Sequence, residues 1–319
     1  MNSGTMIKSH DYKELCDYSW NDKGGGDPPS GIVHVHGHKL RDFFLEAGRE
    51  GNNNKYVVVH SIDDFSTCYQ DRHEPWKDYL RYTRGQEFYE YLKSQNSYPI
   101  KLPLAHNPEN CNGGDKYTVR TYQFTACTFN SIPDNILKIY STNSQVDEIE
   151  SLPFGLQNEE EVELIKKIRG ENVKQGRINT KKLLYVNFYN DTAERKLLND
   201  YFSISSPDWV THYHGKSPRS KEDFLRDIAE HLFVLCPRGN GLDTWRLWQT
   251  LYLGSIPIVD HFEQEKDFGQ LPILRFEDIR QLNMRALLDC RSAPQGCSYD
   301  IMDLEYWEKQ FNNWREKLV

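Results

Sequence analysis

Two arginines close together in one segment carry the strongest chemical signal in the sequence. Arg238 lies in a loop with a proline and two glycines, and Arg246 follows in the first turn of a predicted helix. A guanidinium group binds phosphate oxygens through paired N–H donors, and the N–H groups at a helix start favour the same anions. This combination predicts a phosphate site, and a diphosphate suits its two charges.

The residues around the two arginines predict the elements that position them. HLFVLC (231–236) and SIPIVD (255–260) predict buried strands, and the segment between them predicts a helix. Asp243 is a candidate N-cap, and it shares one helix face with Arg246 and Gln249. Ligands of open parallel sheets bind outside the carboxyl ends of the strands, where this loop lies. The alternative is a plain crossover, in which the glycines serve packing and the arginines pair with carboxylates.

Strands and helices alternate along the rest of the chain. The apolar runs and helical spacings predict strands at 31–37, 55–64 and 181–189, a helix or strand at 133–143, and helices at 38–50, 76–94, 191–202, 220–231 and 304–318. Ser220 and Asp223 form a candidate capping box. This alternation predicts parallel sheets with helices on both faces, and therefore an α/β protein.

The length of 319 residues predicts more than one hydrophobic core. The expected division is an N-terminal extension (1–30), an amino-terminal lobe (31–155), a carboxyl-terminal lobe (156–300) and a C-terminal amphipathic helix (301–319). Leu304, Trp307, Phe311, Trp314 and Leu318 recur at spacings of three and four in that last segment, which predicts a helix docked on the body of the protein.

The composition excludes several classes of function. The chain has 47 acidic and 39 basic residues, a net charge of −8, and no basic block that would follow a nucleic-acid backbone. Nucleic acid is therefore not an expected partner. No segment reaches the roughly 18 apolar residues of a membrane span. The seven cysteines contain no CxxC pair, which favours reduced thiols over a disulfide frame or a zinc site.

The segment PRGNGLDTWRLWQTLYLGSIPIV (237–259) resembles the signature of exostosin-like glycosyltransferases, in which a P-x-G loop precedes an arginine helix and a G-x-I-P-[IV] strand. The likeness is strong over 231–259. It is weaker for KLLYVNF with Arg195, for IYSTN followed by LPFGLQN, and for YVVVHSIDD. A bacterial, algal or viral relative of that family would show the same pattern.

The resemblance implies a GT-B fold, with two Rossmann-like lobes whose parallel sheets face a central cleft. It implies an inverting transfer from a nucleotide sugar, commonly a UDP-sugar, to a hydroxyl of an oligosaccharide or glycan acceptor. No cofactor would be tightly bound and no divalent metal required. The expected location is the cytoplasm, or a soluble catalytic domain of a host or viral glycosylation system.

The reaction that the resemblance implies suggests roles for the basic residues described above and for polar residues at the carboxyl ends of the amino-lobe strands. Inverting transfer needs positive groups for the leaving diphosphate and a base for the acceptor hydroxyl. The candidate bases are Asp63 and Asp64, followed by His60, His36 and His38. Gln249 departs from the family, which usually has a ribose-binding Glu there. The donor-binding candidates are Arg195, Arg238, Gly239, Asn240, Gly241, Asp243, Arg246 and Gln249.

Other roles stay open for several of these residues. Adjacent aspartates are often a turn or an N-cap. The alternation in HVHGH (34–38) puts three histidines on one strand face, but zinc usually needs further ligands. His212 and His214 could contact a donor phosphate or cap a loop. The aromatic residues Trp76, Tyr79 and Tyr82 could stack on an acceptor sugar or belong to the core.

Two other classes of protein are compatible with parts of the pattern. A catalytically inactive protein that binds nucleotide sugars or glycans would keep the arginines, and the Gln249 departure would suit it. A dinucleotide-dependent oxidoreductase would need a glycine fingerprint after an early strand, and HVHGHKLRD (34–42) lacks one. The sequence therefore favours an inverting glycosyltransferase.

Overall fold

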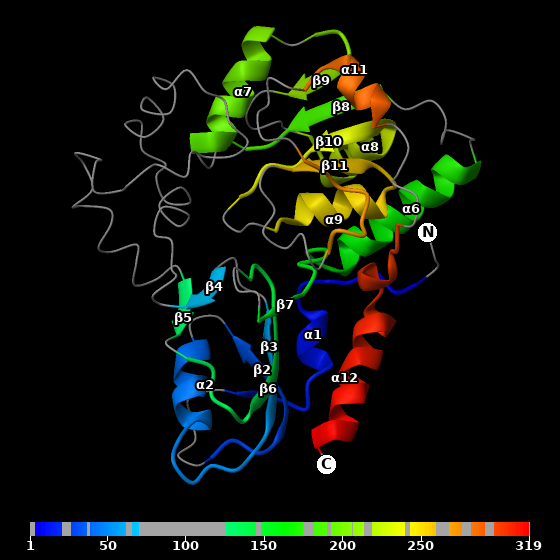
Figure 1. The fold of residues 1–319 in the computed structure, drawn as a ribbon. Coiled ribbons are helices and arrows are strands. Elements are labelled where there is room, and N and C mark those ends of the chain that lie inside the picture. The colour runs from blue at the N-terminus through cyan, green and yellow to red at the C-terminus, as the bar shows by residue number, and fades with distance from the viewer. Residues whose placement is uncertain are drawn as a thin grey trace, which may run out of the picture.

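A computed structural model describes most of the chain as two lobes, each built around a parallel sheet (Figure 1). The described residues are 4–20, 27–36, 39–61, 66–69, 126–129, 131–144, 148–174, 182–189, 193–205, 207–213, 219–239, 243–259, 268–275, 282–290 and 297–318. The predicted helix at 76–94 lies outside them.

The first sheet has the order β1-β2-β3-β6-β7, and all of its strand pairs are parallel. Its strands are β1 (Tyr18–Trp20), β2 (Gly31–His36), β3 (Tyr56–Ser61), β6 (Ile136–Ser141) and β7 (Glu150–Ser151). A separate parallel pair consists of β4 (Ser66–Tyr69) and β5 (Ala126–Phe129). The segment 133–143, predicted as a helix or a strand, thus contains a strand.

The second sheet has the order β12-β11-β10-β8-β9, again with parallel pairs only. Its strands are β8 (Lys182–Asn187), β9 (Val210–Tyr213), β10 (His231–Leu235), β11 (Ile256–Val259) and β12 (Leu274–Arg275). The chain adds β9 on one side of β8 and then continues with β10 on the other. The strand order therefore reverses between β8 and β10, which is where open α/β sheets bind ligands.

Helices cover both faces of each sheet. They are α1 (Asp11–Glu14), α2 (Leu40–Ala47), α6 (Glu159–Lys174), α7 (Ala193–Ser205), α8 (Lys221–Glu230), α9 (Trp245–Tyr252), α11 (Met284–Asp289) and α12 (Leu304–Leu318), with a 3₁₀ turn at Asp300–Met302. In the first lobe, α2 lies on one face and α1 and α12 on the other (Figure 1). The predicted α/β class, with two parallel sheets, is confirmed.

The alternation of side chains along the strands explains this double covering. In β3, Tyr56 and Val58 point to the core under α2, whereas Val57 and Val59 point to the core under α1 and α12. Because both faces are buried, every residue of β3 is buried, and the strand reads as the continuous apolar run noted in the sequence. Ser220 is the N-cap of α8, and its Oγ accepts a hydrogen bond from Asp223 N at 3.1 Å, which is one of the two bonds of the predicted capping box.

The predicted C-terminal helix forms and packs on the first lobe. Trp307 and Phe311 of α12 are buried against Tyr12 and Tyr140, and the Trp307 ring meets both tyrosine rings edge to face. Residues 7–20 also belong to this lobe, since Ile7 and Tyr12 lie in its core and β1 pairs with β2. The sequence pattern did not predict α1 or β1. None of the helices in the described part of the chain is long and apolar enough to cross a membrane.

We expect Trp307→Ala to lower the free energy of unfolding by about 3–5 kcal/mol, because it leaves a cavity between α12 and the first sheet. The Trp307 indole also donates to Ile301 O at 2.9 Å, and that acceptor would lose its partner. Urea denaturation measures the change. Glu308→Ala, on the exposed side of the same helix, should change stability by less than about 0.5 kcal/mol. Similar losses in both variants would contradict the packing described.

Candidate functional site

A pocket of about 500 Å³ lies where the strand order of the second sheet reverses. It opens at the carboxyl end of β8 and beside the first turn of α9, the helix that follows β10. Its lining residues are Gln157, Glu161, Asn187, Phe188, Tyr189, Arg195, Arg219, Ser220, Lys221, Phe224, Thr244, Trp245, Arg246 and Gln249.

The lining of this pocket is strongly basic, although the chain is acidic. It includes Arg195, Arg219, Lys221 and Arg246, but Glu161 is its only carboxylate among the described lining residues. The whole chain carries a net charge of −8. A local excess of cations in a partly enclosed site concentrates anions and favours a ligand with several negative charges.

Arg195, in the first turn of α7, holds the loop that follows β10. Its Nε donates to Arg238 O at 2.9 Å and its Nη2 donates to Pro237 O at 3.2 Å. The Arg195 side chain is buried, and a Cβ atom on Gly239 would lie 2.8 Å from Nη2. A side chain at position 239 would therefore require the end of the Arg195 side chain to move. Arg195 both lines the pocket and fixes the loop that carries Arg238.

Arg246 lies between two aromatic rings of the pocket. Its guanidinium carbon is 5.1 Å from the centre of the Phe224 ring and 5.8 Å from that of Phe188. Arginine stacks favourably on aromatic faces, so these rings orient the guanidinium plane at the pocket wall. Burial raises the pKa of the nearby Cys236 thiol to about 11. The positive charge of Arg246 acts in the opposite direction and lowers that pKa.

Gln249, one turn after Arg246, binds a carboxylate on a different helix. Its Nε2 donates to Glu161 Oε1 at 2.7 Å, and Glu161 Oε2 accepts from Gln157 N at 2.8 Å. Glu161 lies in the first turn of α6 and is fully buried. Only the amide N–H₂ can donate to a carboxylate, so this contact fixes the orientation of the Gln249 amide. The Glu161 carboxylate thus lies beside Gln249, although residue 249 itself carries a neutral amide.

We expect Gln249→Glu to lower the free energy of unfolding by about 2–4 kcal/mol, because it places two carboxylates in contact at a buried position. Thermal and urea denaturation measure the effect. Exchanging the residues in Glu161→Gln/Gln249→Glu restores one amide and one carboxylate, and should recover most of the loss. If Gln249→Glu alone were as stable as the wild type, the contact between Gln249 and Glu161 would not contribute to stability.

Asp243 has a different role from the predicted N-cap. The N-cap of α9 is Thr244, and the Asp243 carboxylate accepts hydrogen bonds from Phe154 N at 2.8 Å and from Trp248 Nε1 at 2.7 and 2.8 Å. Its backbone N–H donates to Asn143 Oδ1 at 2.8 Å. Asn143 follows β6 of the first sheet, so Asp243 joins the two lobes. Burial raises the pKa of Asp243 to about 7.

The candidate bases are placed only in part. Asp63, Asp64 and His38 lie outside the described residues. His60 is fully buried near the end of β3, and its Nδ1 is 2.9 Å from Ser141 Oγ on the neighbouring strand. His36, the last residue of β2, is exposed. Burial lowers the pKa of His34 to about 3, with further lowering by His60, so this imidazole is neutral at pH 7.

The donor-binding candidates fall into three groups. Arg195, Arg246 and Gln249 line the pocket together. Arg238 and Asp243 are not among its lining residues, and Gly239 lies against Arg195. Asn240 and Gly241 are outside the described residues, as are His214, Trp76, Tyr79 and Tyr82. His212 lies within hydrogen-bonding distance of Asn199 Oδ1, at 3.1 Å.

Most of the lining residues were not predicted as site residues from the sequence, among them Glu161, Arg219, Lys221 and Trp245. Glu161 lies among three consecutive glutamates, which read as an ordinary acidic first turn of a helix. Arg219 and Lys221 flank the capping serine of α8, and only the sheet topology brings that helix start to the pocket. The only signal in the sequence for these two pocket residues was the pair of basic residues at the start of α8.

Comparisons with known proteins give little further information. No family model and no curated protein matches the chain. Among solved structures, the chain is similar to an α,α-trehalose-phosphate synthase (UDP-forming) from Burkholderia vietnamiensis, at 9% identity and a TM-score of 0.32. The match covers 92% of this chain and 74% of that one. A likeness this weak does not establish a shared fold or function.

Proposed function

We propose that the protein is a glycosyltransferase that takes its sugar from a nucleotide-sugar donor bound in the pocket of the second lobe. The observation that carries the proposal is the placement of four basic side chains in one pocket, at the point where the strand order of a parallel sheet reverses. Such crevices bind nucleotides in α/β proteins, and the cations match a diphosphate. The resemblance of 231–259 to exostosin-like glycosyltransferases supports the same function.

The proposed chemistry assigns the leaving group to this pocket. When the bond between the sugar and the diphosphate breaks, negative charge grows on the diphosphate, and Arg246 with the α9 N-terminus stabilises it. The acceptor oxygen forms the new bond to the sugar, and a base removes its proton. Asp63 and Asp64 remain the predicted bases. Inversion, a UDP-sugar donor, a GT-B arrangement and independence from a divalent metal are further parts of the proposal.

The Glu161 and Gln249 pair gives the pocket a second polar end. With Nε2 bound to Glu161, the Gln249 amide keeps its oxygen as an acceptor for hydroxyl groups. Ribose and sugar hydroxyls require such acceptors, whereas inorganic phosphate does not. Tyr189 and Trp245, which are 52% and 38% exposed, add aromatic surface for a base or a sugar ring. This combination favours a nucleotide sugar over a simple anion.

A panel of UDP-, GDP- and CMP-sugars tests the function. We expect slow hydrolysis of one donor, with release of its nucleoside diphosphate, and faster turnover when a mixture of glycan acceptors is added. Addition of EDTA should leave the rate unchanged. Binding without turnover in the presence of acceptors would instead support an inactive nucleotide-sugar-binding protein. If no member of the panel bound, the proposal would be wrong.

A further inference from the structure

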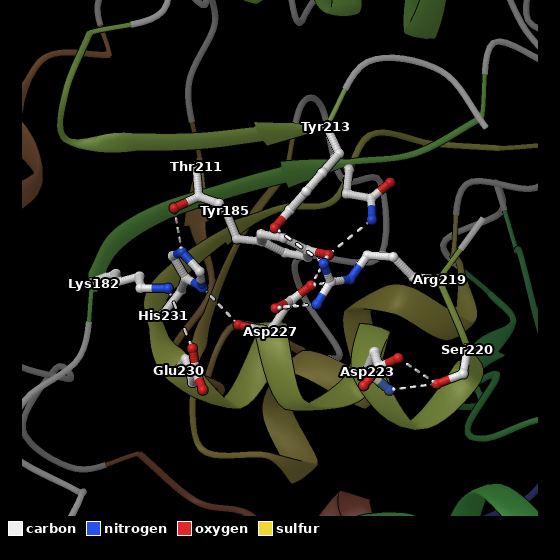
Figure 2. A network of polar contacts seen from close by, with 11 residues as sticks. Lys182, Tyr185, Thr211, Tyr213, Arg219, Ser220, Asp223, Asp227, Glu230 and His231 are labelled. Carbon is white, nitrogen blue, oxygen red and sulfur yellow. Dashed lines mark hydrogen bonds and ion pairs between the residues drawn. The ribbon is translucent and has the colours of Figure 1, made fainter. Parts of the chain in front are cut away.

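Arg219, a lining residue of the pocket, forms a forked ion pair with Asp227 (Figure 2). It precedes α8, and its Nε lies 2.7 Å from Asp227 Oδ2, while its Nη2 donates to Asp227 Oδ1 at 3.0 Å. Its Nη1 donates to Tyr213 OH at 3.2 Å, and the guanidinium lies 4.9 Å from the centre of the Tyr213 ring. These contacts fix the guanidinium in one orientation.

The fork leaves part of the guanidinium available to the pocket. A guanidinium has five N–H groups, and these contacts use three of them. The two that remain lie one on each terminal nitrogen, without a recorded partner in the described part of the chain. Arg219 lines the pocket, and its side chain is 31% exposed. A pair of N–H groups on the terminal nitrogens can bind two oxygens of one phosphoryl group.

Asp227 is itself held from several directions. Tyr185 OH donates to its Oδ2 at 3.1 Å, and Asn187 Nδ2 donates to that same phenol oxygen at 2.8 Å (Figure 2). The Asp227 carbonyl lies 2.6 Å from His231 Nδ1. Asn187 lines the pocket, but Asp227 and Tyr185 do not. A single buried carboxylate is thus connected to two residues of the pocket wall.

We propose that Arg219 binds an anionic phosphoryl group of the ligand, and that Asp227 is a positioning residue that acts through Arg219. A structural ion pair alone would not require the guanidinium to face a pocket that already contains Arg195, Lys221 and Arg246. The fork fixes the arginine before the ligand arrives, so little side-chain freedom is lost on binding. The inference rests on the proposed function and deepens it, because it assigns a phosphoryl group of the ligand to one particular basic residue of that site.

The test is calorimetric titration of the full chain with inorganic pyrophosphate and with UDP. Arg219→Gln should weaken both by about 10- to 100-fold, and Asp227→Asn by about 5- to 20-fold. Glu230→Gln is the matched control, since Glu230 lies on the same helix and pairs with the surface residue Lys182. It should bind like the wild type. Wild-type affinity in Arg219→Gln would overturn the proposal.

A double variant separates positioning from a general effect on structure. If Asp227 acts through Arg219, Arg219→Gln/Asp227→Asn should bind within about twofold of Arg219→Gln. Fully additive losses would overturn the positioning role. If Asp227→Asn does not fold, Arg219→Lys tests the importance of the fork from the arginine side, because it keeps the charge and loses the paired contact with Asp227. It should bind about 5-fold or more weakly than the wild type.

The outcomes distinguish this inference from the proposed function. Pyrophosphate binding that depends on Arg219, without turnover of any nucleotide sugar, would support the inference and contradict the function. Turnover that depends on Arg246 but not on Arg219 would support the proposed function and contradict the inference. Failure of the wild type to bind either anion would overturn both.

Discussion

Arg246→Ala is expected to lower donor turnover by about 100- to 1,000-fold, the largest effect on activity among these predictions. Arg246 lies in the first turn of α9, beside the reversal of strand order, and its guanidinium is oriented by Phe188 and Phe224. In the proposed reaction it meets the charge that grows on the leaving diphosphate. Its removal therefore affects kcat as well as donor binding. Steady-state release of nucleoside diphosphate measures both parameters.

Two further variants make this result specific. Arg246→Lys keeps the charge but loses the planar fork, so we expect an intermediate loss of about 10- to 50-fold. Arg285→Ala removes an exposed arginine of α11, which is not among the residues lining the pocket, and should leave turnover unchanged. Unchanged turnover in Arg246→Ala would instead favour the plain crossover interpretation of the 231–260 segment.

Asp243→Ala should lower the free energy of unfolding by about 3–5 kcal/mol, a loss as large as that expected for Trp307→Ala. Its carboxylate accepts from Phe154 N and Trp248 Nε1 in a buried site, so alanine leaves both donors without an acceptor. The junction with Asn143 would also loosen. Urea denaturation measures the loss, and Asp289→Ala, an exposed aspartate, should stay within about 0.5 kcal/mol of the wild type. Equal stability of the two variants would contradict the role of Asp243 at the lobe junction.

The same residue predicts a dependence of stability on pH. The folded-state pKa of Asp243, about 7, lies above its ordinary value of 3.8. The folded protein therefore holds a proton that the unfolded chain releases, and the associated stability is lost as the pH rises from about 4 to 7. Relative to Asp243→Asn, the wild type should lose on the order of 2–3 kcal/mol between pH 5 and pH 8. A constant difference between the two proteins would contradict the raised pKa.

The sequence was sufficient to predict the fold class and much of the second lobe. Continuous apolar runs such as those of β3 and β10 predict strands buried on both faces, and such strands occur in parallel sheets. The loop between β10 and α9 was expected at the carboxyl end of the sheet, and Arg246 and Gln249 do line a pocket there. Each of these features could be predicted because the residues that determine it lie close together in the sequence.

The features that the sequence did not predict depend on contacts between distant segments. Glu161 and Gln249 are 88 residues apart, and nothing in either segment indicates that they meet. Arg219 reaches the pocket because β9 lies outside β8 in the sheet. Asp243 has the residue type and position of an N-cap, but its carboxylate accepts from Phe154 N and Trp248 Nε1, and its backbone N–H donates to Asn143. Local capping rules could not anticipate those neighbours.

The most direct test of the central claim is a crystal structure of the protein with UDP. The account predicts the diphosphate in the pocket of the second lobe, within hydrogen-bonding distance of the Arg246 guanidinium and facing the start of α9. It also predicts a ribose hydroxyl near the Gln249 amide oxygen. UDP bound in the first lobe, or a pocket that remained without nucleotide at saturating UDP, would contradict it.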